Sequence, residues 1–344
     1  MILGRPRSGT TLIRTLFDAH PNVKIPPEFP VILPLYQKFR NVKDWDEEKI
    51  LSFVDQIFQN PGFNNRKLDH LKLDRETFTS NLLLLAHKGN TQDFLKSINY
   101  YSYSLFLKRE IQCVGDKNPI YSIYLKRLLK IFPDARFICI IRDYRDNYIS
   151  MKGLKDLNLE APLLSLQVAR WRYVVRLFLA YKKKYPARFY ILRYEDLVQN
   201  HEKVFGELCS FIGIQYDPAV FDFFTKKEES LKLYPKELIE KYHQSLMNPI
   251  NTGRMDRWKK ELNDKQVRFA DQIAGKYADI LGYERKISRF NLLLYLKSCP
   301  AVVYCWLIFK ILESGSYLPS KISLMLNLKL LVLVRTYNFF FSKK

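Results

Sequence analysis

Cysteine is scarce in this sequence, and its positions form no metal-binding pattern. The 344 residues include five Cys, none of them in a Cys-x-x-Cys pair, at positions 113, 139, 209, 299 and 305. An odd count without such pairs argues against a disulfide scaffold and against a cysteine zinc site. Four of the five His, all but His20, have no Asp, Glu or His partner at the spacing of metal ligands. We therefore expect no bound metal.

Acidic residues are few relative to basic ones. The chain has 35 Asp and Glu against 56 Lys and Arg, which gives a net charge of +21. Such an excess favours an anionic partner: nucleic acid, a phosphorylated small molecule or a lipid headgroup surface. Hydrophobic residues make up 47% and charged residues 26%, an ordinary globular composition that argues against a disordered or fibrous chain.

The start of the chain lacks an apolar run long enough for a signal peptide. Met1 is followed almost at once by Gly4 and Arg5, so the first expected strand is very short. Either this strand is minimal or the true start lies upstream. The pattern predicts a protein made and kept in the cytoplasm.

Short apolar runs alternate with amphipathic stretches along most of the chain. Strands are expected at 2–3, 111–114, 136–141 and 189–192, and helices at 10–19, 120–132 and 145–154. Strand, turn and helix in repetition predict an α/β fold with a parallel sheet flanked by helices.

Two regions depart from this alternation. Residues 36–110 are mostly helical in pattern and are expected to form an inserted helical lobe. A helical pattern over 267–281 ends at Gly282, a residue suited to the position after a helix. We therefore expect one domain over 1–284, followed by an apolar and basic tail over 285–344.

The most specific motif is Gly4-Arg5-Pro6-Arg7-Ser8-Gly9-Thr10-Thr11, which follows the first strand and opens a helix. Its Gly-x4-Gly-x-Thr spacing matches a P-loop, whose backbone N–H groups hold phosphate oxygens beside a helix N-terminus. Thr10 replaces the P-loop lysine, which makes a kinase or ATPase less favoured. Arg7 supplies a cation, so the loop still predicts a phosphate-like ligand. The competing interpretation is a plain glycine turn.

A second motif joins Arg142 to Ser150. The expected strand 136–141 runs directly into Arg142, which places the guanidinium at the carboxyl edge of the sheet, where α/β folds bind ligands. Ser150 lies about two turns into the next helix, and both side chains can donate to one phosphate. Taken alone, the motif is equally consistent with a surface ion pair.

Together these motifs resemble the sulfotransferases that use 3′-phosphoadenosine 5′-phosphosulfate (PAPS), and most closely the tyrosylprotein branch with its bacterial relatives. The resemblance covers about residues 1–284 and implies a fold similar to that of nucleotide kinases. The loop is similar to the family's 5′-phosphosulfate loop and implies donor contacts from Arg5, Arg7, Ser8, Gly9, Thr10 and Thr11. Arg142 and Ser150 are similar to its 3′-phosphate pair.

Three further segments support the resemblance. Gly115-Asp116-Lys117-Asn118-Pro119 resembles the family's Lys-x-Pro segment, which implies that Lys117 reaches the sulfuryl group. The segment that begins Arg193-Tyr194 resembles its Tyr-Glu strand end and implies that Tyr194 contacts the nucleotide. The basic–Trp stretch at 251–258 resembles the segment that closes over the nucleotide, where Arg257 would join the 3′-phosphate grip.

The resemblance also implies a general base. Glu28 lies at the offset where the tyrosylprotein branch has its catalytic glutamate, although Pro27, Phe29 and Pro30 depart from that pattern. This departure leaves the acceptor open between peptide tyrosine, glycan, lipid and small molecule. The alternative base is His20, which a helix C-terminus would also favour as a cap.

Sulfuryl transfer by in-line displacement to a hydroxyl (or amine) is the function this resemblance implies, with Glu28, Arg7 and Lys117 as catalytic residues and no metal. The alternative is a P-loop kinase or NTPase. Binding driven by charge alone is a third possibility, but the basic residues form no nucleic-acid-binding module, and we expect no nucleic-acid partner.

The tail is apolar enough to suggest contact with a membrane. Its longest uncharged run, 298–309, is shorter than the roughly 20 residues of a spanning helix. The rest is interrupted by Lys297, Lys310, Lys329 and Arg335. Pro300 is expected to break the first of two apolar segments, 290–312 and 322–341. We expect interfacial helices on an anionic membrane surface, with packing on the domain and membrane spanning as the alternatives.

Overall fold

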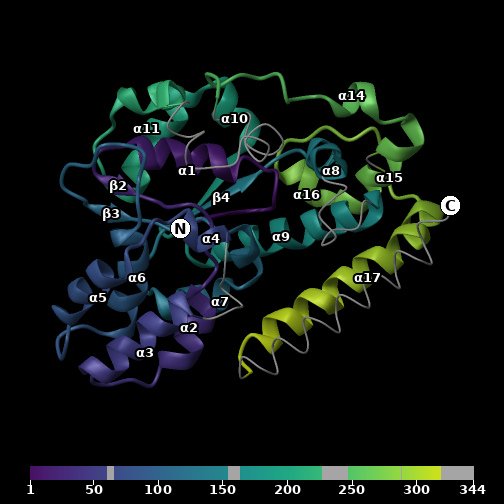
Figure 1. Cartoon of the computed structure of the whole chain (residues 1–344). Coiled ribbons are helices and arrows are strands. Elements are labelled where there is room, and N and C mark those ends of the chain that lie inside the picture. Colours follow the sequence, from purple (N-terminus) through teal and green to yellow (C-terminus); the bar gives the residue numbers. More distant parts are fainter. Residues whose placement is uncertain (60–65, 154–162, 227–246, 288, 319–344) are drawn as a thin grey trace. The chain divides into compact units, whose positions relative to one another are not determined.

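The computed structural model describes residues 1–59, 66–153, 163–226, 247–287 and 289–318 (Figure 1). They form an α/β fold in which a parallel sheet is flanked by helices, as the sequence predicts. Strands β1 (Ile2–Gly4), β4 (Phe137–Ile141) and β5 (Phe189–Arg193) pair in the order β1-β4-β5. A second parallel pair joins β2 (Val23–Lys24) to β3 (Cys113–Val114), with Val23 opposite Cys113.

The chain forms two compact units that alternate along the sequence. Unit 1 comprises 1–3, 10–137 and 201–250, and unit 2 comprises 4–9, 138–200 and 251–344. The domain boundary near Gly282 remains a prediction from the sequence.

Unit 1 contains the expected helical lobe (Figure 1). Its helices are α2 (Ile32–Phe39), α3 (Glu47–Phe58), α4 (Arg66–Asp69), α5 (Arg75–Leu83) and α6 (Thr91–Tyr101). Trp45 stacks on Phe94 with 3.9 Å between ring centroids, and Phe53 packs edge-on against both rings. Asn90 and Asp93 close a capping box that starts α6, so local sequence and packing agree there.

The rest of unit 1 surrounds α1. It consists of α1 (Thr10–Ala19), η1 (Pro119–Ile123), α7 (Leu125–Ile131), α11 (His201–Ile212) and η2 (Pro218–Lys226), together with β2 and β3. The apolar face of α1 is buried, and Phe17 packs on Phe205 of α11 with 5.0 Å between ring centroids.

Unit 2 is built around a long helix, α9 (Leu164–Lys184). Its other helices are α8 (Tyr144–Lys152), α10 (Tyr194–Gln199), α14 (Trp258–Glu261), α15 (Asp264–Ala274), α16 (Lys276–Ile280) and α17 (Leu292–Gly315). Both α15 and α17 pack against α9. Trp171 of α9 is buried and donates its indole N–H to the carbonyl of Arg142 at 2.8 Å, which fixes the end of β4.

Three expected elements need correction. The single helix expected over 120–132 is a 3-10 helix followed by α7, and the helix expected over 267–281 is divided into α15 and α16 by Gly275 at φ 56°. Pro300 does not break its segment, because α17 runs continuously through it. Proline removes one backbone hydrogen bond of a helix, and the long packing surface on α9 compensates. The second apolar segment, 322–341, lies outside the described residues.

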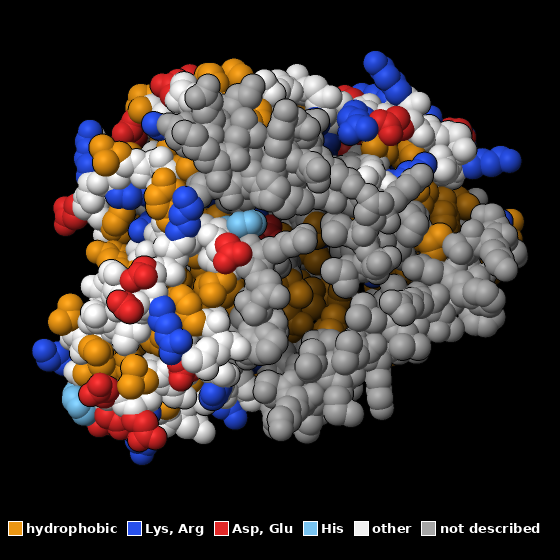
Figure 2. Space-filling view, in the orientation of Figure 1, with side chains coloured by type: hydrophobic (Ala, Val, Ile, Leu, Met, Phe, Trp, Pro, Cys, Tyr) orange, Lys and Arg blue, Asp and Glu red, His pale blue; other side chains and the backbone are white. Residues whose placement is uncertain are grey.

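Charged side chains of both signs cover the helical lobe. Figure 2 shows acidic and basic groups interspersed over it on the face in view. Several are paired, including Lys49 with Asp46 and Arg75 with Asp55. The visible face of the lobe therefore carries mixed charge rather than one basic patch.

Candidate active site

The P-loop-like segment has the backbone of an anion-binding turn. Arg7 and Gly9 adopt positive φ angles of 65° and 96°, and Ser8 N–H donates to the Arg5 carbonyl at 3.2 Å. A Cβ at position 9 would lie 2.5 Å from Cδ2 of Tyr194, so only glycine fits between the loop and this ring. The same loop then opens α1 at Thr10.

Two polar side chains of unit 2, Asn147 and Gln167, hold the loop in place. Asn147 of α8 donates to the Pro6 carbonyl at 2.8 Å and to Ser8 Oγ at 3.2 Å. The buried Arg5 guanidinium donates to Asn147 at 3.4 Å and to Gln167 of α9 at 2.5 Å. The Arg5 side chain therefore holds the loop in place. The contact with PAPS that the resemblance implies for Arg5 would come from its backbone.

Arg142 lies at the end of β4, as the sequence predicts, and is only 3% exposed. One of its terminal nitrogens donates to the Arg7 carbonyl at 3.3 Å and the other to the Arg254 carbonyl. Its guanidinium carbon lies 4.8 Å from the ring centroid of Tyr194. The buried Nε has no hydrogen-bond partner within the described residues, so this cation has unused capacity for an anion.

Arg7 and Ser150 meet directly. Nε of Arg7 donates to Oγ of Ser150 at 3.0 Å, which joins the loop to α8. Unit 2 therefore brings together the loop, Arg142, Ser150 and Tyr194, four predictions made from separate parts of the sequence.

Arg257 is arranged differently from the other expected phosphate contacts. Its side chain is 42% exposed and pairs with Glu261 on α14 at 2.8 Å. The contact with Arg142 comes instead from the backbone carbonyl of Arg254. A role for Arg257 at the 3′-phosphate stays a prediction.

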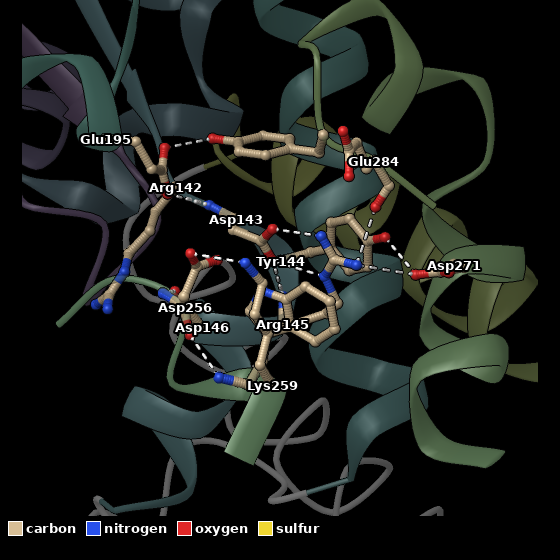
Figure 3. Close-up of polar contacts among 12 residues, drawn as sticks. Arg142, Asp143, Tyr144, Arg145, Asp146, Glu195, Asp256, Lys259, Asp271 and Glu284 are labelled. Atoms are coloured by element: carbon tan, nitrogen blue, oxygen red, sulfur yellow. Dashed lines mark hydrogen bonds and ion pairs between the residues drawn. The ribbon is translucent and has the colours of Figure 1, made fainter. Parts of the chain in front are cut away.

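The carboxylate of Glu195, in the Tyr-Glu pair that follows β5, has a structural role. Glu195 accepts from Asp143 N–H at 2.9 Å and from the Tyr283 hydroxyl at 2.8 Å. Burial raises the pKa of Glu195, and these two donors counteract that shift. The carboxylate thereby fixes the turn after Arg142 (Figure 3).

Unit 1 holds the remaining candidates, and two of them form an ion pair. Lys117 is buried, and its ammonium contacts Oε1 of Glu28 and lies 3.3 Å from Oγ1 of Thr11. Burial lowers the pKa of Lys117, while Glu28 raises it again. The Glu28 side chain is 40% exposed, so it can meet a substrate from solvent.

Several hydrogen bonds hold the segment around Lys117 in place. Asn118 donates to both oxygens of the buried Asp116 at 2.9 Å, and Ile2 N–H donates to the Asp116 carbonyl at 2.8 Å. A parallel bridge between Ile2 and Lys117 extends this contact. Burial raises the pKa of Asp116 to about 6. These contacts fix the lysine backbone beside β1.

His20 is engaged on both ring nitrogens. It is 2% exposed; Nε2 lies 2.8 Å from the Gln215 carbonyl, and Nδ1 accepts from Asn22 N–H at 3.1 Å. Both ring nitrogens of His20 are therefore engaged within unit 1. The cap interpretation of His20 and the choice of Glu28 as the base stay predictions.

The sequence alone did not indicate which polar residues support the site. Asn147 and Gln167 hold the loop from two helices, and Asp146 binds the segment before α14. All three lie in sequence patterns that ordinary helices also show. What sets them apart is a polar side chain at a position that the fold buries. Within the described residues, no group of three or more His, Cys, Asp or Glu could hold a metal ion.

Comparison with known proteins supplies independent information. The sequence pattern that defines the sulfotransferase family matches residues 1–218. A putative protein-tyrosine sulfotransferase of Caenorhabditis briggsae is 22% identical over 83% of this chain and 89% of its own length. Protein-tyrosine sulfotransferase 1 of Danio rerio is 25% identical over 74% of this chain and 64% of its own length.

A solved structure has a similar fold. The sulfotransferase domain of the olefin synthase from Synechococcus PCC 7002 aligns with a TM-score of 0.50 at 18% identity, over 82% of this chain and 94% of that domain. At this identity the likeness concerns the fold alone.

Proposed function

Because the chain belongs to the sulfotransferase family and is an enzyme of sulfuryl transfer, we propose that it moves a sulfuryl group from PAPS to a hydroxyl or amine acceptor. The choice of donor rests on the buried Arg142. Its Nε has no hydrogen-bond partner among the described residues, and its guanidinium lies against the loop and Tyr194. The kinase alternative gains no support from the comparisons.

The donor contacts follow from the residues of unit 2. The N–H groups of the loop are the natural ligands of the 5′-phosphate, and the helix that begins at Thr10 adds a favourable dipole. Arg142 and Ser150 would hold the 3′-phosphate through charge-assisted hydrogen bonds, and Arg257 would join them. A grip on the 3′-phosphate would discriminate against ATP, which lacks that group.

In the transfer step, the acceptor oxygen attacks sulfur in line with the leaving phosphate. A new S–O bond to the acceptor forms as the bridging S–O bond to the 5′-phosphate breaks, and 3′,5′-adenosine bisphosphate leaves. The acceptor proton passes to the Glu28 carboxylate. Arg7 and Lys117 would neutralise the charge that grows on the bridging and sulfuryl oxygens. Thr10 and Thr11 follow the loop directly in the chain, and Thr11 already contacts Lys117.

Calorimetric titration of the wild-type protein tests the donor assignment. We expect 3′,5′-adenosine bisphosphate to bind without magnesium and ADP, which shares its 5′-phosphate but lacks the 3′-phosphate, to bind at least tenfold more weakly, because a charge-assisted hydrogen bond contributes about 1.5–3 kcal/mol. Equal or tighter binding of ATP in the same buffer would contradict a 3′-phosphate site and would favour the kinase alternative.

The tail offers a second proposal, contact with an anionic membrane surface. The 24-residue helix α17 has the length and composition of a membrane-crossing helix. Its buried face packs on α9, but Leu293, Leu296, Val303 and Leu307 are 46–72% exposed along one stripe. Monomeric soluble proteins rarely expose such a contiguous apolar surface. Residues 285–344 add ten Lys or Arg against one Glu, which suits anionic headgroups.

Vesicle co-sedimentation tests this proposal. We expect the protein to sediment with vesicles of equal parts phosphatidylcholine and phosphatidylglycerol, and far less with phosphatidylcholine alone. The double variant Leu296→Gln/Leu307→Gln should lose binding, whereas the matched control Leu84→Gln, at an exposed leucine of the lobe, should keep it. Resistance to alkaline carbonate extraction would indicate spanning, and a concentration-dependent dimer without vesicles would assign the stripe to a second copy; either result contradicts the proposal. The cytoplasmic location expected from the sequence is compatible with contact at a membrane surface and stays a prediction.

A further inference from the structure

Asp146 of α8 is a buried carboxylate that the transfer step does not use. It is 2% exposed, and both of its oxygens face the segment 251–258, here called the closing segment. Oδ2 accepts from Asp256 N–H at 2.8 Å and Oδ1 from Trp258 N–H at 3.0 Å (Figure 3). One side chain therefore binds the backbone of the closing segment at two points.

The backbone of the closing segment adopts an uncommon conformation at Asp256. Asp256 adopts a positive φ of 58°, which is uncommon for a residue other than glycine. A turn in which Met255 N–H donates to the Thr252 carbonyl at 2.8 Å precedes it. Without Asp146, two N–H groups at the end of this turn would lose their acceptor, because no other described group binds them.

Other contacts attach the same segment to the Arg142 region. Arg142 donates to the Arg254 carbonyl, and the Arg145 guanidinium lies 3.6 Å from the ring centroid of Trp258. Asp146 and Ser150 are four residues apart in α8 and so project from the same side of the helix. The helix that carries the Ser150 hydroxyl thus also carries the anchor of the closing segment.

We infer that Asp146 is a positioning residue for the nucleotide: it holds the closing segment so that Arg254 and Arg257 stand beside the 3′-phosphate pair. The inference rests on the proposed function, since it assumes that the pair binds a nucleotide. Asp146 acts through the backbone of the segment and does not itself contact the donor.

The charges around Asp146 give the anchor a pH dependence. Arg142 at the end of β4 favours the carboxylate, whereas Asp143 in the following turn opposes it. In the closing segment the Asp256 carboxylate pairs with Lys259 of α14 at 2.9 Å, and Arg145 of α8 is bound to Asp143 at 2.7 Å. Burial is the largest influence and raises the pKa of Asp146 to about 6. Below that pH the carboxyl is protonated and accepts hydrogen bonds more weakly.

The test compares bisphosphate binding by the wild type and by Asp146→Asn, titrated calorimetrically from about pH 5 to pH 8. At pH 8 we expect Asp146→Asn to bind about 10- to 100-fold more weakly, because the amide leaves one backbone N–H without an acceptor. Below pH 6 the two proteins should converge. The phosphates of the ligand titrate in the same range, but equally for both proteins, so the ratio of the two affinities is the readout.

Two further variants sharpen the comparison. Asp256→Asn keeps the backbone N–H that Asp146 binds and removes only a surface ion pair, so its affinity should match the wild type. Asp146→Glu keeps the carboxylate and should recover part of the loss; it also carries the comparison if Asp146→Asn unfolds. Equal binding by the wild type and Asp146→Asn at pH 8 would overturn this inference and leave the proposed function intact. Failure of the wild type to bind the bisphosphate would overturn the proposed function as well.

Discussion

Replacing Glu28 by Gln is expected to lower kcat for sulfuryl transfer about 10²- to 10⁴-fold, the usual contribution of a general base. The amide keeps the size of the side chain but cannot take the acceptor proton. Donor affinity should change little, because Glu28 is not among the residues proposed to bind the phosphates. Initial rates of bisphosphate release with PAPS and an acceptor alcohol in excess would give kcat directly.

The matched control is His20→Gln, the other candidate base. Both ring nitrogens of His20 are engaged with Gln215 and Asn22, so this variant should keep kcat and lower the melting temperature instead. A large loss of kcat in His20→Gln with normal rates in Glu28→Gln would reverse the assignment of the base.

The Glu28→Gln variant should also change the pH dependence of activity. Burial lowers the pKa of Lys117 and Glu28 raises it, so removing the carboxylate lowers that pKa further. A protonated Lys117 is needed to neutralise the sulfuryl oxygens, and activity should fall as the pH rises through its pKa. We expect the alkaline limb of the pH–rate profile to move to lower pH in Glu28→Gln.

Arg142→Ala is expected to weaken binding of 3′,5′-adenosine bisphosphate about 10²- to 10³-fold while leaving ADP binding nearly unchanged. Arg142 can give the 3′-phosphate more than one charge-assisted hydrogen bond, each contributing about 1.5–3 kcal/mol. ADP keeps its contacts with the N–H groups of the loop, because Asn147 still holds the Pro6 carbonyl after the bond from Arg142 to the Arg7 carbonyl is lost. Calorimetric titration of both ligands measures the change in selectivity.

Arg172→Ala serves as the control for removing a partly buried arginine from unit 2. Arg172 lies on α9 and donates to the Ile273 carbonyl at 2.9 Å, so its loss should affect stability without changing selectivity. Arg142→Lys should be intermediate, because an ammonium keeps the charge but lacks the planar fork of donors. A uniform loss of affinity for ADP and the bisphosphate in Arg142→Ala would mean that Arg142 shapes the loop rather than reads the 3′-phosphate.

The sequence predicted the parts of the fold that depend on local pattern. The loop at 4–9 and helix α1 follow from the spacing of glycines and the apolar periodicity after Thr10. The end of β4 at Ile141 and the positive φ of 72° at Gly282 were also accessible in this way. Each depends on residues within one or two turns of one another.

Contacts between distant segments could not be predicted. The attachment of Asp146 to Asp256 spans 110 residues, and the ion pair of Lys117 with Glu28 spans 89. Tertiary packing also decided that Pro300 stays inside a helix, because the contacts of α17 with α9 outweigh one missing hydrogen bond. Burial of polar side chains is a property of the assembled fold, which is why the supporting residues were missed.

The most direct measurement of the central claim is transfer of label from [³⁵S]PAPS to a panel of hydroxyl and amine acceptors by the wild-type protein, with and without a metal chelator. We expect labelled acceptor and an equal amount of 3′,5′-adenosine bisphosphate, at the same rate in both buffers. Absence of transfer to every acceptor class, together with magnesium-dependent turnover of ATP, would contradict sulfuryl transfer by this chain.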